Sequence, residues 1–114
     1  MSTITPILPS GGSNGRGIKL ASTATTIHTA TSTSGEFDRI RLWVYNSHTA
    51  AVACTIECGG STSPDDLIKD TIPPGVGLWL MIDGIRYNGG VVIKGYGATT
   101  NVLTAHAQID RYAP

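Results

Sequence analysis

The stretch Phe37–Asn46, FDRIRLWVYN, decides the fold of this chain. Two kinds of side chain alternate along it with a period of two, which predicts a β-strand with two different faces. The inner face would carry Ile40, Leu42 and Val44, and the outer face Arg39, Arg41, Trp43 and Tyr45. Because the outer face includes two large aromatic side chains, we expect it to do more than meet solvent.

A second strand follows directly. The residues NSHTA at 46–50 are typical of a turn, and residues 51–58 return with a new alternation. One face of this return strand would carry Val52, Cys54, Ile56 and Cys58. Residues 37–58 are therefore predicted to form an antiparallel hairpin.

The rest of the chain repeats the pattern in shorter runs separated by Gly, Pro, Asn and Ser. These runs are residues 18–21, 25–30, 66–72, 77–82, 85–87, 91–96 and 102–111. In the second run Ile27 alternates with Thr26 and His28. Asp83-Gly84 and Asn88-Gly89 are expected to be turns.

The connections between these runs are too short for crossover helices, so the strands are expected to be antiparallel. The sequence predicts an all-β fold, a single β-sandwich or jelly roll of about eight strands. In residues 77–82 we place Leu78, Leu80 and Ile82 on the inner face and Trp79 and Met81 on the outer one. The predicted core includes Ile40, Leu42, Val44, Val52, Ile56, Leu78, Leu80, Leu103 and Ile109.

Size and charge narrow the class of function. A chain of 114 residues makes one domain, which we place at residues 18–114. Lys and Arg number 8 and Asp and Glu number 8, and only 14% of residues are charged. A neutral chain without a basic run is not expected to bind nucleic acid. So few charges favour burial of surface between subunits.

The first residues, MSTITPILPSGG, contain neither a basic region nor a long apolar one, and no later stretch is long enough to span a membrane. We therefore expect the chain to be made in a cytoplasm and not to enter a membrane.

Residues 1–17 are predicted to form an extended N-terminal arm. Pro6, Pro9 and several glycines exclude an internal strand or a useful helix. Yet Ile4, Ile7 and Leu8 are apolar, which is unusual for a solvated linker. The arm could be a frayed terminus, or it could be ordered on a neighbouring subunit.

No motif for catalysis or for a cofactor is found. Cys54 and Cys58 lie too far apart on one strand for a disulfide and lack zinc-ligand spacing, so they are predicted to be free thiols. The three histidines are scattered, the acidic residues stand mostly at turns, and GGSNGRG lacks the ending of a phosphate loop. We expect no enzyme activity, no cofactor and no metal.

The large side chains that are predicted to face outward, Trp43, Tyr45, Trp79 and Met81, remain unexplained. A second sheet could cover them, or they could form a subunit interface, where Trp and Tyr are common anchors. The candidates for an interface with other copies or with another protein are Ile4, Ile7, Leu8, Trp43, Tyr45, Trp79 and Met81.

From Phe37 to Tyr112 the order of features resembles small β-sandwich virion proteins of tailed bacteriophages. The features are FDRIRLWVYN, NSHTA, AVACTIECGG, SPDDLI, TIPPGVGLWL, NGGVVIKGYG and NVLTAHAQIDRY. The resemblance implies a structural protein of the particle. Such proteins are typically head decoration or cement proteins, often trimers, that bind the major capsid protein at the capsid surface.

Three alternatives stay open. Related sandwiches serve at the neck, tail or fibres of a particle. A carbohydrate-binding module would use Trp43, Tyr45 or Trp79 to stack on sugar rings, and a decoration protein could itself bind glycans. A small hydrolase would need a convergent polar triad, which the sequence does not show.

Overall fold

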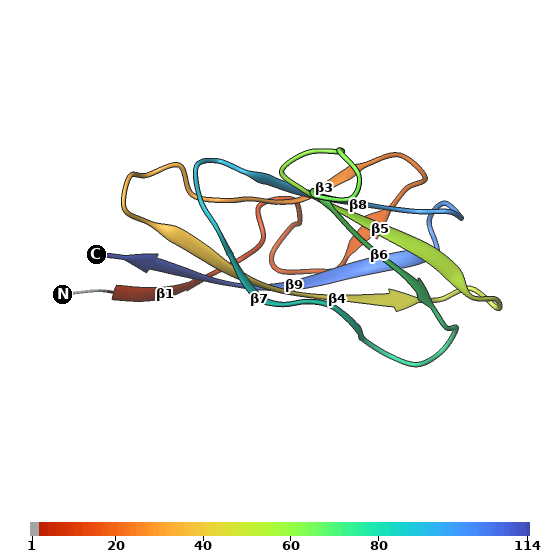
Figure 1. Cartoon of the computed structure of the whole chain (residues 1–114). Helices are drawn as coiled ribbons and strands as arrows, with labels where there is room; N and C mark the ends of the chain where they lie inside the picture. Colours follow the sequence, from red (N-terminus) through yellow and green to blue (C-terminus); the bar gives the residue numbers. More distant parts are fainter. Residues whose placement is uncertain (1–2) are drawn as a thin grey trace.

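The computed structural model describes residues 3–114 and contains two β-sheets packed face to face (Figure 1). The described residues form nine strands and no helix, in a body of 48 × 28 × 20 Å. The all-β sandwich predicted from the sequence is therefore confirmed. The strands are β1 (Thr3–Ile7), β2 (Ile18–Leu20), β3 (Thr25–Thr29), β4 (Phe37–Asn46), β5 (Val52–Cys58), β6 (Leu67–Ile72), β7 (Trp79–Tyr87), β8 (Val92–Gly97) and β9 (Leu103–Ala113).

Sheet A has the strand order β1-β9-β4-β7, with β2 pairing with the other half of β9, and sheet B has the order β3-β8-β5-β6. All pairings are antiparallel. Strands β4 and β9 pair along ten residues and form the centre of sheet A. The two termini lie side by side at one end of the sandwich, where Thr3 pairs with Ala113 (Figure 1).

The core lies between the two sheets, where the inward side chains of both meet. Seven of the nine predicted core residues are buried there: Ile40, Leu42, Val44, Val52, Ile56, Leu103 and Ile109. Glycines in β8 allow close packing of the sheets. A Cβ atom on Gly95 would lie 3.3 Å from the side chain of Leu20, which belongs to the opposite sheet.

The prediction for Leu78 and Leu80 was wrong, because both are about half exposed. The reason is a β-bulge in β7: Leu42 pairs with Ile82, but the next residue, Trp43, pairs with Leu80. The extra residue is Met81, and a bulge of this kind shifts the alternation by one position. Met81 and Ile82 therefore both lie in the core, and the leucines before them face outward.

The prediction of a turn at Asp83-Gly84 was wrong, because these residues form a second bulge within β7. Ile40 pairs with Ile85 while Arg41 pairs with Asp83, so Gly84 is an extra residue within one continuous strand. Its φ of +80° is a left-handed conformation that favours glycine. The runs at 77–82 and 85–87 are therefore parts of the same bulged strand.

A third bulge changes the faces of β3. Thr26 pairs with Lys94 and His28 pairs with Ile93, which leaves Ile27 as the extra residue. Ile27 and His28 are both buried, although the sequence pattern placed them on opposite faces. This bulge brings an imidazole into the interior.

The N-terminal arm includes an edge strand on its own chain. Residues Thr3–Ile7 pair with the C-terminal half of β9, and Pro6, which has no N–H to donate, is tolerated at this edge. Ile7 packs against the core, and Ile4 remains 58% exposed. The arm is thus seated on the domain to which it belongs.

Candidate assembly surface

The outer face of sheet A gathers most of the large apolar side chains that the strands expose, with the exception of Ile85, which pairs with the inward Ile40. At one end Trp43 and Leu80 are cross-strand neighbours; Tyr45 lies on the same face of β4, and the exposed Leu78 directly precedes β7. At the opposite end, Phe37, Tyr112 and Ile4 form a single row across β4, β9 and β1. We call this outer surface of sheet A the A face.

The end near the termini is built on an aromatic pair. The Phe37 and Tyr112 rings stack with centroids 4.5 Å apart and an angle of 16° between their planes. The Arg86 guanidinium carbon lies 5.0 Å from the Phe37 ring centre, within reach of a cation–π contact. A shallow hollow of about 310 Å³ opens beside these three side chains.

A charged belt separates the two apolar ends of the A face. The basic members are Arg39, Arg41 and Arg86, and the acidic ones are Asp83 and Asp110. Within this belt the Arg41 Nε and Asp83 Oδ1 atoms lie 3.5 Å apart, and both side chains are exposed. Exposed pairs of this kind contribute about 0–1 kcal/mol, so the belt can exchange its partners at little cost.

The structure brings together only some of the seven predicted interface residues. Ile4, Trp43 and Tyr45 lie on the A face, and Leu8 is exposed just after β1. Ile7 is half-buried, Met81 is in the core, and Trp79 faces inward as the partner of Val44. The Trp79 indole Nε1 donates a hydrogen bond to Asp70 of β6 at 2.7 Å.

Sequence reasoning missed Leu78, Leu80, Phe37 and Tyr112 as members of this surface. The leucines were hidden by the bulge at Met81, which no residue pattern marks. For Phe37 there was a signal, because it lies on the same face of β4 as Trp43 and Tyr45.

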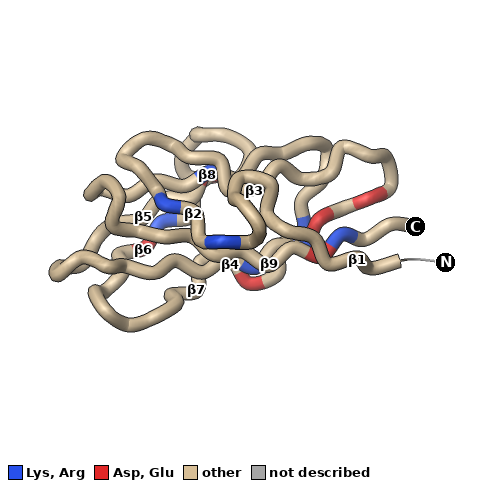
Figure 2. The backbone as a smooth tube through the Cα atoms, turned by 180° about the vertical axis from the view of Figure 1, so that it is seen from behind, with Lys and Arg blue, Asp and Glu red and all other residues tan. Residues whose placement is uncertain are grey.

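The outer face of sheet B is different in chemistry. Its outward residues on β5, β6 and β8 include more small, polar and charged side chains than large apolar ones: Ala53, Thr55, Glu57, Leu67, Lys69, Thr71, Val92, Lys94 and Tyr96. We call this surface the B face. Charged residues are sparse along the whole backbone, as Figure 2 shows from behind.

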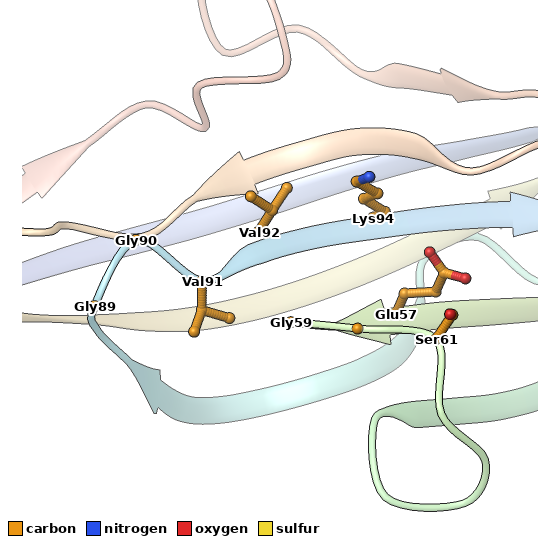
Figure 3. Close-up of a pocket in the computed structure, with 9 residues that line it drawn as sticks. Glu57, Gly59, Ser61, Gly89, Gly90, Val91, Val92 and Lys94 are labelled. Atoms are coloured by element: carbon orange, nitrogen blue, oxygen red, sulfur yellow. The ribbon is translucent and has the colours of Figure 1, made fainter.

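A groove of about 470 Å³ lies at one end of the B face (Figure 3). Its walls are two glycine-rich turns, at residues 59–61 and 89–90, and its floor includes the cross-strand pair Glu57 and Lys94. None of the described residues that line it is aromatic, so it lacks a surface on which a sugar ring could stack. Its chemistry does not single out a ligand.

A buried polar network links the two sheets beside the arm. The Asp38 carboxylate, on the inner face of β4, accepts hydrogen bonds from His28 Nε2 at 2.8 Å and from the Thr31 amide at 3.0 Å. Arg111 donates two more, at 2.8 and 2.9 Å. His28 and Asp38 are 1% and 0% exposed.

Burial by itself would raise the pKa of Asp38, but the hydrogen bonds from Arg111, His28 and Thr31, with the charge of Arg111, outweigh it and lower the pKa. The carboxylate is therefore held ionised, and the network joins β3 of sheet B to β4 and β9 of sheet A. The sequence carried one signal for it: Asp38 lies on the same face of β4 as Ile40, where an acid needs a partner.

The two cysteines are free thiols, as predicted. Burial, with a smaller effect of the Asp70 charge, raises the pKa of Cys54 to about 12. Burial also raises the pKa of Cys58, which is hydrogen-bonded to Tyr87. Thiols held protonated in this way are poor nucleophiles and poor metal ligands.

Within residues 3–114, no group of three or more His, Cys, Asp or Glu side chains is arranged to hold a metal ion. The same residues contain no helix of the length and apolarity needed to cross a membrane. No known protein family and no curated protein matches the sequence.

Proposed function

We propose that this protein is a non-enzymatic structural component of a tailed-bacteriophage particle. More specifically, we propose a head decoration or cement protein that associates with itself as a trimer and binds the major capsid protein at the capsid surface. The observation that carries the proposal is the A face, an outer surface with large apolar and aromatic side chains at both ends, on a chain of which only 14% of residues are charged. The resemblance of residues 37–112 to such virion proteins supports the same role.

The A face has the area that a specific contact needs. Strand β4 has 10 residues, so the face is about 33 Å long, and its four strands are about 15–20 Å wide. One copy would then offer about 500–600 Å², and a covering neighbour would bury about 1,000–1,200 Å² in total. This value lies at the lower end of specific interfaces, which suits a lattice where contacts repeat.

One edge of each sheet is a poor place for association, which favours the face. Strand β7, at one edge of sheet A, is interrupted by two bulges. On β6, at the edge of sheet B, the charged Asp70 turns inward to Trp79. Bulges and inward charges are common means of blocking edge-to-edge pairing.

Sedimentation velocity over 1–100 µM tests the self-association. The wild-type chain is expected to form trimers. Leu80→Asp, which places a charge on the exposed A face, is expected to raise the dissociation constant at least tenfold, equivalent to about 1.4 kcal/mol. Thr71→Asp on the B face is the matched control and should behave like the wild type. A wild-type chain that is monomeric at 100 µM would exclude self-association.

A second measurement tests the particle. In a phage lysate in which this chain is made, it should co-purify with intact particles on a density gradient, and Leu80→Asp should reduce its occupancy. Labelling of the bound protein under the electron microscope then separates a head location from a neck, tail or fibre location. Absence from every particle fraction would overturn the virion role.

One observation favours the carbohydrate-binding alternative. Trp43 and Tyr45 project from the A face two residues apart, with Arg41 and His106 beside Trp43. This arrangement offers both stacking and polar contacts to a sugar. Quenching of Trp43 fluorescence by oligosaccharides, lost in Tyr45→Ser, would support it. Unchanged fluorescence across a glycan panel would leave self-association as the role of the face.

A further inference from the structure

The segment after β1 crosses from sheet A to the edge of sheet B. The Gly11 amide donates to the Ile27 carbonyl at 2.9 Å, and the Thr29 amide donates to Ser10 Oγ at 2.8 Å. A Cβ atom on Gly11 would lie 2.1 Å from the Thr26 carbonyl oxygen, so this close approach requires glycine. The N-terminal arm thereby covers the outer edge of β3 as a strap.

The strap also reaches a buried imidazole. The Ser10 amide donates a hydrogen bond to His28 Nδ1 at 3.1 Å. Nδ1 must accept this bond, so it carries no proton while the strap is seated. The single ring proton is then on Nε2, which faces the acceptor-only carboxylate of Asp38 at 2.8 Å. Both nitrogens are committed, and the seated strap fixes a neutral imidazole in one tautomer.

We propose that residues 3–11 form a proton-sensitive strap, which is seated most firmly while His28 is neutral. A proton on Nδ1 would face the Ser10 N–H, so two donors would point at each other and this hydrogen bond would be lost. The strap would then be held only by its pairing with β9 and by the other bonds of Ser10 and Gly11, so its release would cost less free energy. The released state binds one proton more than the seated state. Falling pH therefore favours release, and rising pH favours seating.

The charges around His28 do not remove this effect. Asp38, from β4, already shares its negative charge with Arg111 of β9 and with the Thr31 amide. Glu36, before β4, accepts the hydroxyl hydrogen bond of Thr31. Strand β8 offers Ile93 opposite His28, and the strap itself offers the uncharged Ser10. A proton on His28 would thus give the network of Asp38, Arg111 and His28 a net positive charge in a buried place.

Hydrogen exchange measured by mass spectrometry on the full chain, from pH 8 to pH 5 and corrected for intrinsic rates, tests the proposal. The amides of residues 4–11 should lose up to tenfold of their protection for each pH unit below the onset of release, the limit for coupling to one proton. Amides in the centre of β4 should keep their protection. Equal protection of residues 4–11 at all pH values would overturn the proposal.

Variants assign the effect to His28. His28→Gln is expected to abolish the pH dependence. His106→Gln is the matched control, because His106 lies beside Gly17, which is outside the strap, and makes no bond to Ser10. It should keep the pH dependence, and so should Ser10→Ala, which retains the amide donor. If His106→Gln abolished the effect instead, the proposal would be wrong.

A measurement on the wild type covers the case in which His28→Gln does not fold. Nitrogen NMR of the imidazoles at pH 8 should show His28 protonated at Nε2 and unprotonated at Nδ1. A proton on Nδ1 in the seated state would contradict the proposal. The test does not depend on self-association, because it can be run on Leu80→Asp.

Discussion

The two outer faces of this sandwich are built from the same kind of strand, but they differ in what they expose. The A face carries Trp43, Tyr45, Leu78 and Leu80 at one end of a belt of charged residues. The B face carries threonines and charged residues with fewer large apolar side chains, and it has a groove between glycine turns. Large exposed apolar side chains on a sheet face often mark an interaction surface, and this difference between the faces is the reason why we propose a partner for the A face.

The two faces can be compared only if the two sheets are held together as one body. The buried network around Asp38 joins the sheets, so Asp38→Asn is expected to have the largest effect on stability. Asparagine removes the charge and replaces one of the two acceptor oxygens with an NH2 donor, so His28, Thr31 and Arg111 cannot all keep their hydrogen bonds. We expect a cost of about 3–5 kcal/mol in the free energy of unfolding. Urea denaturation measures it. Asp83→Asn, in the exposed pair with Arg41, is the control and should cost less than about 1 kcal/mol.

The same variant has a defined pH dependence. Because the pKa of Asp38 is lowered in the folded state, its stabilising effect is complete above the ordinary pKa of an aspartate and is lost as pH falls through the lowered value. Below about pH 4 the wild type should therefore lose stability faster than Asp38→Asn. Equal slopes would show that another carboxylate dominates acid unfolding.

The A face and the B face each carry a half-buried aromatic residue, and replacing them one at a time compares the two faces directly. Trp43→Ser on the A face and Tyr96→Ser on the B face should each lower the free energy of unfolding by about 1–3 kcal/mol, since each loses outward packing. Only Trp43→Ser should also weaken self-association, by tenfold or more in sedimentation velocity. If both variants weakened it equally, the A face would have no special role.

The bulge that redirects β7 can be tested at Gly84. Alanine there is strained by the φ of +80°, and its Cβ atom would also lie 2.7 Å from Arg39, so we expect a loss of about 1–2 kcal/mol in thermal or urea unfolding. Gly75→Ala is the matched control, with a φ of +69° and no heavy atom near the added group. The difference between the two variants isolates the contact with Arg39 on the A face. No difference would mean that Arg39 moves freely.

The smallest effect concerns the inner side of sheet B. Because the pKa of Cys54 is about 12, its thiol should not react with an alkylating reagent at pH 8 in the folded protein. After denaturation without a reductant, both Cys54 and Cys58 should react. Rapid labelling of Cys54 in native conditions would show that sheet B opens more easily than its packing indicates.

The A face could be predicted only in part from the sequence. Trp43 and Tyr45 were found because β4 is a regular strand in which alternation assigns each side chain to a face. Met81 and Trp79 were placed outward by the same rule in β7, and there it failed. A bulge is set by how a strand pairs with its neighbour, so the residues of β7 alone could not reveal it.

The sequence by itself determined the all-β class, the hairpin at 37–58, most of the core and the free thiols, since each follows from local alternation or from distance along one strand. Only the tertiary structure decided which side chains share the A face, where the arm is seated and that His28 meets Asp38 and Ser10. These depend on contacts between residues far apart in the chain, such as Asp38 and Arg111. The physical reason is that a period-two pattern gives each strand two faces, whereas sheet order, register and bulges decide what each face meets.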